Sequence, residues 1–320
     1  MATADQIKLL IHSHFEQDED RFKTIALQLA AHEAQRGHKS FAREIRDIVD
    51  KSKKSTIKVL PFNKELNEMI QVTSVDYRLT DIVVSEEIKE RIQRIIKESI
   101  QREKLRRYGL INRRKILIAG PPGTGKTLTA SVLAGELNLP FCTILVDKLI
   151  TKFMGETSVK LRQIFDTIRE IPGVYLFDEF DAIGTERSMD NDVGEMRRVL
   201  NSFLQFIEQD ESTSLIVAAT NNPRLLDQAL FRRFDDVLHY KLPNKDQISH
   251  LIRNRLAEYH SNRIDMNLVV EESLSLSHAE IAKACDDSIK EVILNDAQYI
   301  DTKLLCKTIK ERKDAYQQGE

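Results

Sequence analysis

The sequence lacks tryptophan and has little glycine, proline, cysteine or net charge. Its 320 residues include 11 Gly, 7 Pro and 3 Cys, and aromatic residues make up 6%. So little glycine and proline excludes collagen-like and low-complexity chains and favours helices. The 48 Lys and Arg nearly balance 50 Asp and Glu, which gives a net charge of -2. A general positive field of the kind that attracts nucleic acid is therefore absent.

Long apolar runs are also missing. The longest, such as Leu215–Ala219, are a handful of residues, whereas roughly 18 are needed to span a bilayer. The first fifteen residues do not combine a basic segment with a long apolar run, so we expect no secretory signal, no membrane partner and a cytoplasmic location. Cys142, Cys285 and Cys306 are odd in number and have no C-x-x-C spacing, so we expect core thiols and neither a disulfide nor a zinc site.

Hydrophobic periodicity divides the chain into four parts. Residues 1–50 have helical spacing and predict an N-terminal helical module, and residues 51–80 begin with Lys and Ser and predict a linker with one short helix. Residues 81–243 start with a helical pattern and continue as β-branched runs that alternate with helices, which predicts a parallel sheet flanked by helices. Residues 244–320 are helical again and predict a small lid. The expected strands are 115–119, 141–145, 173–177, 214–220 and 236–240.

A basic stretch lies between Lys89 and Lys115, with eleven Lys or Arg against three acids. Nucleic-acid binding is one interpretation. A solvated or subunit-facing helix surface is the favoured one, because Tyr108 is the single aromatic residue interleaved among these cations to stack bases.

The strongest motif is a phosphate loop. A buried strand at 115–119 runs into Gly120-x4-Gly125-Lys126-Thr127 and then a helix, which is the pattern and context that the motif requires. Backbone N–H groups would face the phosphates at a helix start, Lys126 would reach the β and γ phosphates, and Thr127 would hold Mg²⁺. The nucleotide-binding candidates are Gly120, Pro121, Pro122, Gly123, Thr124, Gly125, Lys126, Thr127 and Leu128.

Two acids follow the hydrophobic strand at 174–177. Asp178 can bind magnesium through water, and Glu179 can polarise a water for in-line attack on the γ phosphate. GTPases and simple nucleotide kinases usually lack the second acid. Glu179 therefore favours ATP hydrolysis over phosphate transfer to a small molecule.

Further polar residues come after the next strand. Asn221 ends the run Leu-Ile-Val-Ala-Ala-Thr-Asn and is a candidate to hydrogen-bond the γ phosphate or the attacking water. Arg232 and Arg233 are adjacent, without a local acid that neutralises both. An arginine supplied across a subunit boundary can stabilise charge on the γ phosphate, and the choice between these two stays open.

Together these residues resemble the AAA family of ATPases over roughly residues 75–310. Gly120–Thr127 is similar to its Walker A motif, 177–184 to its Walker B segment, 219–221 to its first sensor and 227–235 to its second region of homology. Residues 152–156 resemble the aromatic-hydrophobic-Gly pore loop of hexameric unfoldases, with Phe153 as the gripping aromatic. The resemblance implies ATP and Mg²⁺ as ligands, a ring-shaped homo-oligomer, expected to be a hexamer, and a protein substrate.

The chain departs from the family at three places. Its interface arginines are usually separated by two residues but are adjacent here, and Val83-Val84 replaces a frequent Gly-Gly. The lid motif Gly-x-Ser-Gly-Ala becomes Ser275-Leu276-Ser277-His278-Ala279. Outside the catalytic motifs, residues 1–50, residues 108–110 and the shortened arginine motif also resemble a bacterial subgroup of this family. Some members of that subgroup act beside a subtilisin-like serine protease in anti-phage defence.

We therefore expect an ATPase that threads or remodels a protein partner. Control of a protease would require a separately encoded one, since H-E-x-x-H and G-x-S-x-G are both absent from the sequence. Two alternatives remain open. One is a nucleic-acid-stimulated ATPase of the clamp-loader or transposition-helper kind, and the other is a nucleotide-switched scaffold.

Overall fold

The computed structural model describes residues 8–9, 13, 19–35, 42–43, 45–46, 64–149, 156–181, 193–226, 228–259, 264–297 and 299–317. The chain forms two compact units, Met1–Val59 and Leu60–Glu320. In the first unit, helix α2 (Glu19–Gln35) buries Ile25, Ala26 and Ala30, which lie on one face at helical spacing. This helix agrees with the pattern predicted for residues 1–50, whereas the other helices predicted there fall mostly outside the described residues.

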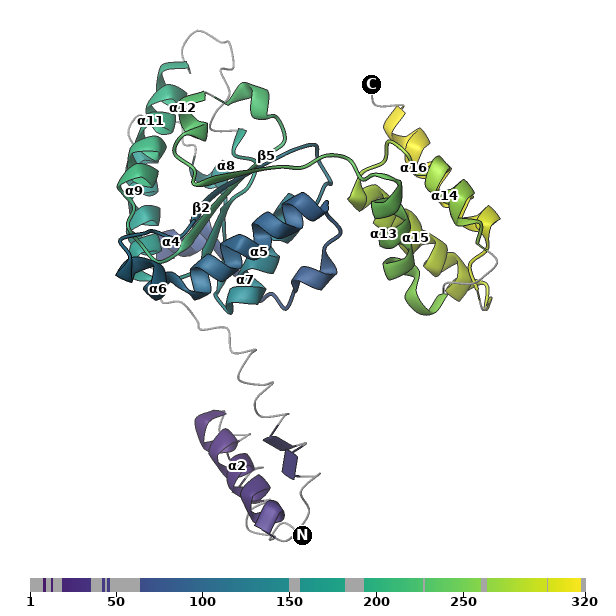
Figure 1. The fold of residues 1–320 in the computed structure, drawn as a ribbon, viewed down its shortest axis with the longest axis horizontal. Helices are drawn as coiled ribbons and strands as arrows, with labels where there is room; N and C mark the ends of the chain where they lie inside the picture. The colour runs from purple at the N-terminus through teal and green to yellow at the C-terminus, as the bar shows by residue number, and fades with distance from the viewer. Residues whose placement is uncertain are drawn as a thin grey trace. The chain divides into compact units, whose positions relative to one another are not determined.

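A six-stranded sheet forms the centre of the second unit, in the order β1-β3-β4-β5-β2-β6 (Figure 1). All neighbouring pairs are parallel except β1 and β3. Every residue of β2, β4 and β5 is buried, because helices cover both faces, as is usual for parallel sheets. The α/β fold class is thereby confirmed. The strands are β1 (Ile70–Thr73), β2 (Lys115–Ala119), β3 (Phe141–Ile144), β4 (Val174–Phe177), β5 (Leu215–Thr220) and β6 (Asp236–His239).

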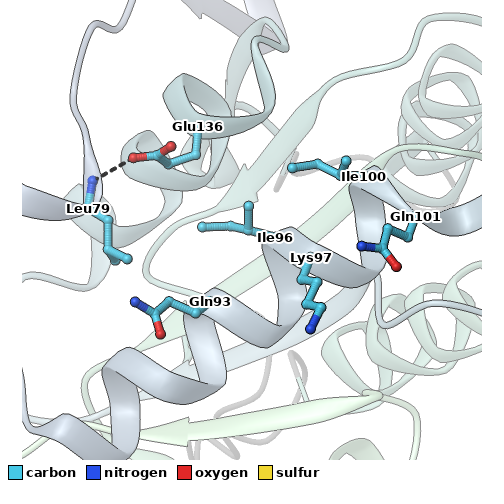
Figure 2. A pocket seen from close by; sticks show the side chains of 7 residues that line it. All are labelled: Leu79, Gln93, Ile96, Lys97, Ile100, Gln101 and Glu136. Atoms are coloured by element: carbon cyan, nitrogen blue, oxygen red, sulfur yellow. Dashed lines mark hydrogen bonds between the residues drawn. The ribbon is translucent and has the colours of Figure 1, made fainter.

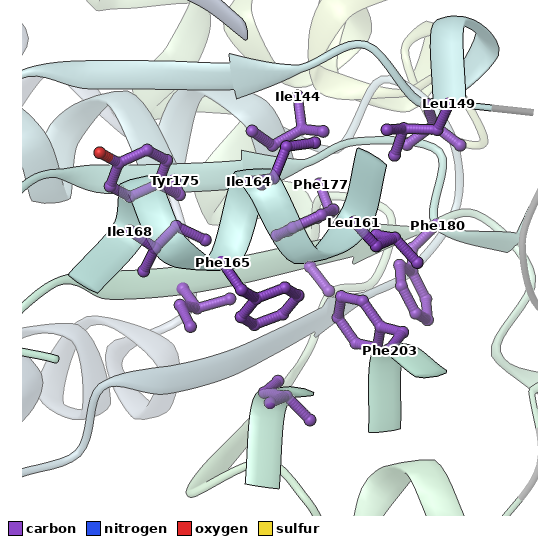
Figure 3. Close-up of a cluster of buried hydrophobic side chains, with 14 of the residues drawn as sticks. Ile144, Leu149, Leu161, Ile164, Phe165, Ile168, Tyr175, Phe177, Phe180 and Phe203 are labelled. Atoms are coloured by element: carbon purple, nitrogen blue, oxygen red, sulfur yellow. The ribbon is translucent and has the colours of Figure 1, made fainter. Parts of the chain in front are cut away.

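Each face of the sheet has its own apolar core. Helices α5 and α7 cover one face, where Ile92, Ile95 and Leu133 are fully buried. Helices α4, α8, α9 and α11 cover the other, and Figure 3 shows that Phe180 and Phe203 meet there, with ring centroids 4.6 Å apart. These helices are α4 (Lys64–Met69), α5 (Glu86–Ile100), α6 (Arg102–Arg107), α7 (Lys126–Leu137), α8 (Val146–Leu149), α9 (Glu156–Glu170), α11 (Val193–Gln209) and α12 (Gln228–Phe231), with the short turns η1 (Leu79–Asp81) and η2 (Pro223–Leu225).

The C-terminal lid is a helical bundle with a separate apolar core. The helical character predicted for residues 244–320 agrees with this bundle, although the seven-residue α14 has little signal of its own. Its apolar run is too short to show a helical period in the sequence. The lid consists of α13 (Lys245–Leu256), η3 (Ala257–Tyr259), α14 (Met266–Glu272), α15 (His278–Leu294) and α16 (Thr302–Gln317).

The structure differs from the expected linker at 51–80, and it divides the helical pattern with which residues 81–243 begin. Strand β1 pairs with β3, so residues 70–73 extend the sheet at its edge and are not linker. This edge strand was missed because four residues with one partner carry little periodic signal. The helical pattern forms two helices, because Gln101 (φ −98°, ψ 18°) ends α5 and begins α6. The other domain boundaries stay a prediction.

All three cysteines are free, Cys142 and Cys285 are buried, and Cys306 is partly buried. Burial raises the pKa of the Cys142 and Cys285 thiols to about 12, which makes both unreactive near neutral pH. Across the described helices, none is long and apolar enough to cross a membrane.

Candidate nucleotide site

The loop between β2 and α7 uses glycine where the backbone requires it. Gly123 has φ +71° and Gly125, which precedes α7, has φ +96°, and glycine adopts such values without steric cost. At Gly120, a Cβ atom would lie 2.5 Å from the carbonyl oxygen of Tyr240. Gly123 and Gly125 thus permit the turn, and Gly120 permits close packing against Tyr240, the residue that follows β6.

Lys126 lies at the centre of the loop. Its ammonium donates to the carbonyl oxygens of Gly120 (2.9 Å) and Pro121 (2.8 Å) and to Oδ1 of Asn221 (2.7 Å). Burial lowers the pKa of Lys126 from its usual 10.5, while Asp178 and Asp181 oppose this change. The loop therefore gathers oxygen atoms around one cation.

Two other side chains form a pair beside the lysine. Thr127 Oγ1 donates to Asp178 Oδ2 at 2.7 Å, so a hydroxyl and a carboxylate lie together where β2 and β4 end. The next residue, Glu179, is exposed and has φ +50°, a strained conformation for a non-glycine residue. Its N–H donates to Asp178 Oδ1 at 2.9 Å. The turn after β4 therefore holds the two acids in different positions, with Asp178 toward the loop and Glu179 in solvent.

Asn221 directly follows β5, the strand between β2 and β4. Its side-chain oxygen contacts Lys126, and its backbone N–H donates to Asp181 Oδ1 at 3.2 Å. Because parallel strands end at the same edge of a sheet, the fold brings together Lys126, Thr127, Asp178 and Asn221, which are far apart in sequence.

The start of lid helix α15 contacts the phosphate loop. The backbone N–H of Ala279 donates to the Gly123 carbonyl oxygen at 2.9 Å, and Ser277 packs against Gly123. Between them, His278 has two ring nitrogens that are shielded from solvent and make no hydrogen bond of normal geometry within the described residues. Burial lowers the pKa of His278 below its usual 6.5, and the nearby Val83 backbone opposes this change. A buried imidazole that favours its neutral form therefore lies beside the loop.

The structure separates the two candidate arginines. Arg233 Nη1 donates to Glu208 Oε1 at 2.7 Å, which ties it to α11 of its own subunit. Arg232 is exposed, and no ion pair involves it in the part of the chain that the structure describes. Arg232 is thus available to another molecule.

Parts of three predicted features lie outside the described residues. They are Phe153 of the pore loop, residues 182–184 of the Walker B segment and Asp227 of the second region of homology. Helix α9 begins at Glu156, the last residue of the predicted pore loop.

Sequence reasoning missed several residues that support the site. Asp181 holds the Asn221 backbone, and Tyr240 shares a 2.6 Å hydrogen bond with Thr129 of α7. Burial raises the pKa of Tyr240 well above its usual value, so it stays a neutral partner. Asp181 could have been noticed as a third acid after β4, whereas nothing local marks Tyr240.

The arrangement of these residues fits a nucleoside triphosphate with a divalent metal. Glycines in the left-handed region free backbone N–H groups at the start of α7, Lys126 supplies a cation, and Thr127 and Asp178 offer the oxygen ligands that Mg²⁺ prefers. Among the described residues there is no cluster of three His, Cys, Asp or Glu that could hold a metal. A metal at Thr127 and Asp178 would therefore complete its coordination with phosphate oxygens and water.

Comparison with known proteins agrees with this geometry. Residues 116–242 match the family described as "ATPase family associated with various cellular activities (AAA)". An uncharacterized AAA family ATPase of Sinorhizobium fredii is 32% identical over 92% of this chain and 90% of its own length. The proteasome-activating nucleotidase of Thermococcus onnurineus is 30% identical over 74% of this chain, and the ATP-dependent zinc metalloprotease FtsH of Magnetococcus marinus is 29% identical over 72%.

The chain covers 62% of the nucleotidase and 35% of the metalloprotease, so it spans less than two thirds of each of these two relatives. With the first relative the match extends over nearly the whole of both chains. The site geometry and these similarities lead to one conclusion: the chain is an ATP hydrolase that belongs to the AAA family of ATPases.

Proposed function

We propose that the chain is a cytoplasmic, ring-forming ATPase, assembled as a hexamer, that uses ATP and Mg²⁺ to remodel or thread a protein partner. One observation carries the chemistry. Lys126, Thr127, Asp178 and Asn221 meet at one edge of the sheet, and the exposed Glu179 lies beside them.

In this proposal each side chain has a separate task. Lys126 exchanges the carbonyl and amide oxygens that it now contacts for phosphate oxygens. Thr127 and Asp178 hold the metal, whose positive charge neutralises the phosphates. Glu179 accepts the proton of the attacking water at its carboxylate. With its oxygen on Lys126, the Asn221 side chain still has an amide nitrogen that can donate to that water or to the γ phosphate.

We assign the arginine that reaches a neighbouring site to Arg232. Arg233 is engaged with Glu208 in its own subunit, and this ion pair positions the turn between α12 and β6. The exposed Arg232 can then extend from that turn across a subunit boundary.

The protein substrate is supported by the relatives and by the pore-loop sequence. The nucleotidase and the metalloprotease are named for proteasome activation and proteolysis, and Phe153 occupies the aromatic position of the predicted loop. The partner could be a subtilisin-like protease in phage defence, as the subgroup resemblance implies.

Ion pairs within the chain account for part of the basic stretch on which a nucleic-acid-stimulated ATPase would depend. Arg91 pairs with Asp236, Arg113 with Glu98, and the buried Arg114 with Asp210. These cations of the stretch 89–115 are neutralised within the fold and support its packing.

Phosphate release with and without an unfolded protein tests the proposal. Casein is a suitable probe, and Phe153→Ala is compared with Phe153→Tyr, which keeps an aromatic ring. We expect casein to stimulate the wild type and Phe153→Tyr but not Phe153→Ala, with basal hydrolysis retained in all three. Stimulation by DNA that decreases with salt, and no response to casein, would favour the nucleic-acid alternative.

A further inference from the structure

Helix α7 follows the phosphate loop, and its two ends are held by contacts of different kinds. At the C-terminal end, the Leu79 backbone N–H donates to Glu136 Oε1 at 2.9 Å, and Arg78 donates to the Gly135 carbonyl oxygen at 2.6 Å. Figure 2 shows the first of these bonds at the rim of a shallow pocket of about 260 Å³, opposite α5. None of the residues that line this pocket belongs to the nucleotide site. The N-terminal end of α7, in contrast, is held by fully buried hydroxyl groups.

These hydroxyl groups belong to Thr129 and Tyr240. Thr129 lies in the first turn of α7, and its Oγ1 donates to the Gly125 carbonyl oxygen at 3.0 Å and lies 2.6 Å from the Tyr240 hydroxyl. A threonine hydroxyl has one hydrogen, and a carbonyl oxygen can only accept. Because Thr129 donates to Gly125, Tyr240 must donate to Thr129. We call this chain of two hydrogen bonds, from Tyr240 through Thr129 to Gly125, the hydroxyl relay.

Burial protects the hydroxyl relay from water and keeps its proton in place. Tyr240 is 4% exposed and Thr129 has no exposed area. Burial also raises the pKa of Tyr240 well above its usual 10, so the phenol keeps the hydrogen that it donates. Water cannot replace a partner that is lost at such a position.

The hydroxyl relay acts on the peptide that joins Gly125 to Lys126. Gly125 has φ +96° and has no side chain to cap the helix. Its carbonyl oxygen accepts both the Thr129 hydroxyl and the Thr129 backbone N–H (2.9 Å). In a planar trans peptide the N–H points opposite to the carbonyl. Fixing the Gly125 carbonyl therefore also fixes the direction of the Lys126 N–H, which faces the phosphates in the proposed site.

Tyr240 also supports the other end of the phosphate loop. Its backbone N–H donates to the Ala119 carbonyl oxygen at 2.7 Å, and its own carbonyl oxygen lies where a Cβ atom on Gly120 would have to be, at 2.5 Å. The Gly120 carbonyl oxygen in turn accepts the Lys126 ammonium at 2.9 Å. A single residue thus contacts Gly120 directly and Gly125 through Thr129.

Tyr240 is also the residue at which the chain leaves the sheet for the lid. Strand β6 ends at His239, and α13 of the lid begins at Lys245 with Asn244 as its cap. Residues 241–243 form neither helix nor strand, and Lys241 and Leu242 are exposed. The connection to the lid therefore starts from the residue that holds the phosphate loop.

We propose that Tyr240 is a positioning residue for nucleotide binding, which acts through the hydroxyl relay to hold the phosphate loop and join it to the connection that leads to the lid. Tyr240 does not touch the nucleotide in this role, because Thr129 and Gly125 lie between them. The inference rests on the nucleotide site of the proposed function and adds a residue outside the loop to it.

Tyr240→Phe tests the relay in the full chain, because it removes the hydroxyl and keeps the ring that packs beside Gly120. We expect the KM for ATP to rise by about fivefold, the effect of one hydrogen bond. The kcat should stay within about twofold, because the loop holds the phosphates equally in the ground and transition states. ADP and pyrophosphate, each titrated with Mg²⁺ in a calorimeter, should weaken by the same factor. Tyr175→Phe is the matched control, since its buried hydroxyl donates to the Ile171 carbonyl oxygen at 2.8 Å before β4 begins, and its KM should match the wild type.

Variants of Thr129 separate positioning from stability. Thr129→Val breaks the relay and should raise the KM as Tyr240→Phe does, whereas Thr129→Ser keeps a hydroxyl and should bind like the wild type. The free energy of unfolding should decrease in Thr129→Val, because the Tyr240 hydroxyl is left buried without a partner. It should recover in the double variant with Tyr240→Phe, in which both partners are apolar. The raised KM should persist in that double variant without exceeding either single change.

Three results would overturn the inference. They are a wild-type KM in Tyr240→Phe, a KM that recovers together with stability in the double variant, and a Thr129→Ser variant that behaves like Thr129→Val. Unequal weakening of ADP and pyrophosphate would also overturn it, because the residue would then act on the nucleoside. In each case the wild-type chain would still bind and hydrolyse ATP, so the proposed function would stand. A wild-type chain that binds neither ADP nor pyrophosphate would remove the proposed function and the relay with it.

Discussion

The two edges of the parallel sheet differ in whether their polar side chains are paired within the chain or exposed to solvent. At the edge where the strands begin, Arg114 and Asp210 form a buried ion pair, and Asp235 Oδ2 accepts the backbone N–H groups of Arg114 (2.8 Å) and Lys115 (2.9 Å). At the edge where the strands end, Glu179 and Asn221 are exposed. The first edge satisfies its charges within the chain, and the second keeps polar groups accessible.

We infer from this difference that the charged residues at the first edge stabilise the fold, whereas the polar residues at the second edge serve catalysis. A buried charge without its partner is costly, so the first edge needs its acids to fold. Glu179 is exposed in a left-handed backbone conformation, and such strain is typical of functional positions. Changes at the first edge should therefore alter unfolding, and changes at the second should alter ATP turnover.

The largest effect is expected for Glu179→Gln. The amide keeps the shape of the side chain but cannot accept a proton, so turnover should decrease by about 10³ to 10⁴, near the upper range for a lost general base. ATP and Mg²⁺ binding should be retained. Steady-state phosphate release measures this, and Glu211→Gln, an exposed acid at the opposite edge, is the control. Turnover near the wild-type rate would remove the water-activating role.

A smaller loss is expected at the arginine pair. Arg232→Ala should decrease turnover by about 10³, the lower range for an arginine that stabilises charge on the γ phosphate. Arg233→Ala should cost less than about tenfold, because its exposed ion pair with Glu208 contributes little. Mixing Arg232→Ala with Glu179→Gln subunits should partly restore activity, since each supplies what the other lacks. Equal losses at both positions, or no rescue in confirmed mixed oligomers, would contradict a role for Arg232 across the boundary.

The first edge is tested by Asp210→Asn. Asp210 has no exposed side-chain area and Arg114 is 9% exposed, so the change leaves a buried guanidinium without its charge partner. The free energy of unfolding should decrease by about 3 kcal/mol, measured by urea denaturation. Asp166→Asn breaks the exposed pair with Arg169 and should cost less than about 1 kcal/mol. A similar effect for both would mean that burial does not decide the strength of these pairs.

The same contrast explains what the sequence could predict. Strands β2, β4 and β5 were predicted within a residue or two because burial on both faces requires continuous apolar runs. The phosphate loop was predicted because its glycines, Lys126 and Thr127 are consecutive. Such features depend on residues that are adjacent in the sequence, so they can be predicted from the sequence alone.

Features that depend on distant residues were not predictable. The pairing of Arg233 with Glu208 needs α11 beside the α12 turn, and the packing of Tyr240 on Gly120 needs β6 beside β2. The departure at Ser275–Ala279 was visible in the sequence, but its consequence was not. Only the folded lid shows that His278 lies next to the loop with both ring nitrogens shielded from solvent.

The smallest expected effect concerns His278. Because Ala279 is hydrogen-bonded to Gly123, His278 lies beside the loop, where we expect the nucleoside that continues from the phosphates. A neutral imidazole can donate one hydrogen bond and accept another, so a nucleoside beside His278 can form a hydrogen bond with its ring. Losing one such bond in His278→Ala should weaken ADP binding by about tenfold and leave pyrophosphate binding unchanged, as measured by calorimetry with Mg²⁺. His250→Ala, an exposed lid histidine, should bind both ligands like the wild type. Equal weakening for ADP and pyrophosphate would show that His278 acts through lid packing, and unchanged ADP binding would remove it from the nucleotide site.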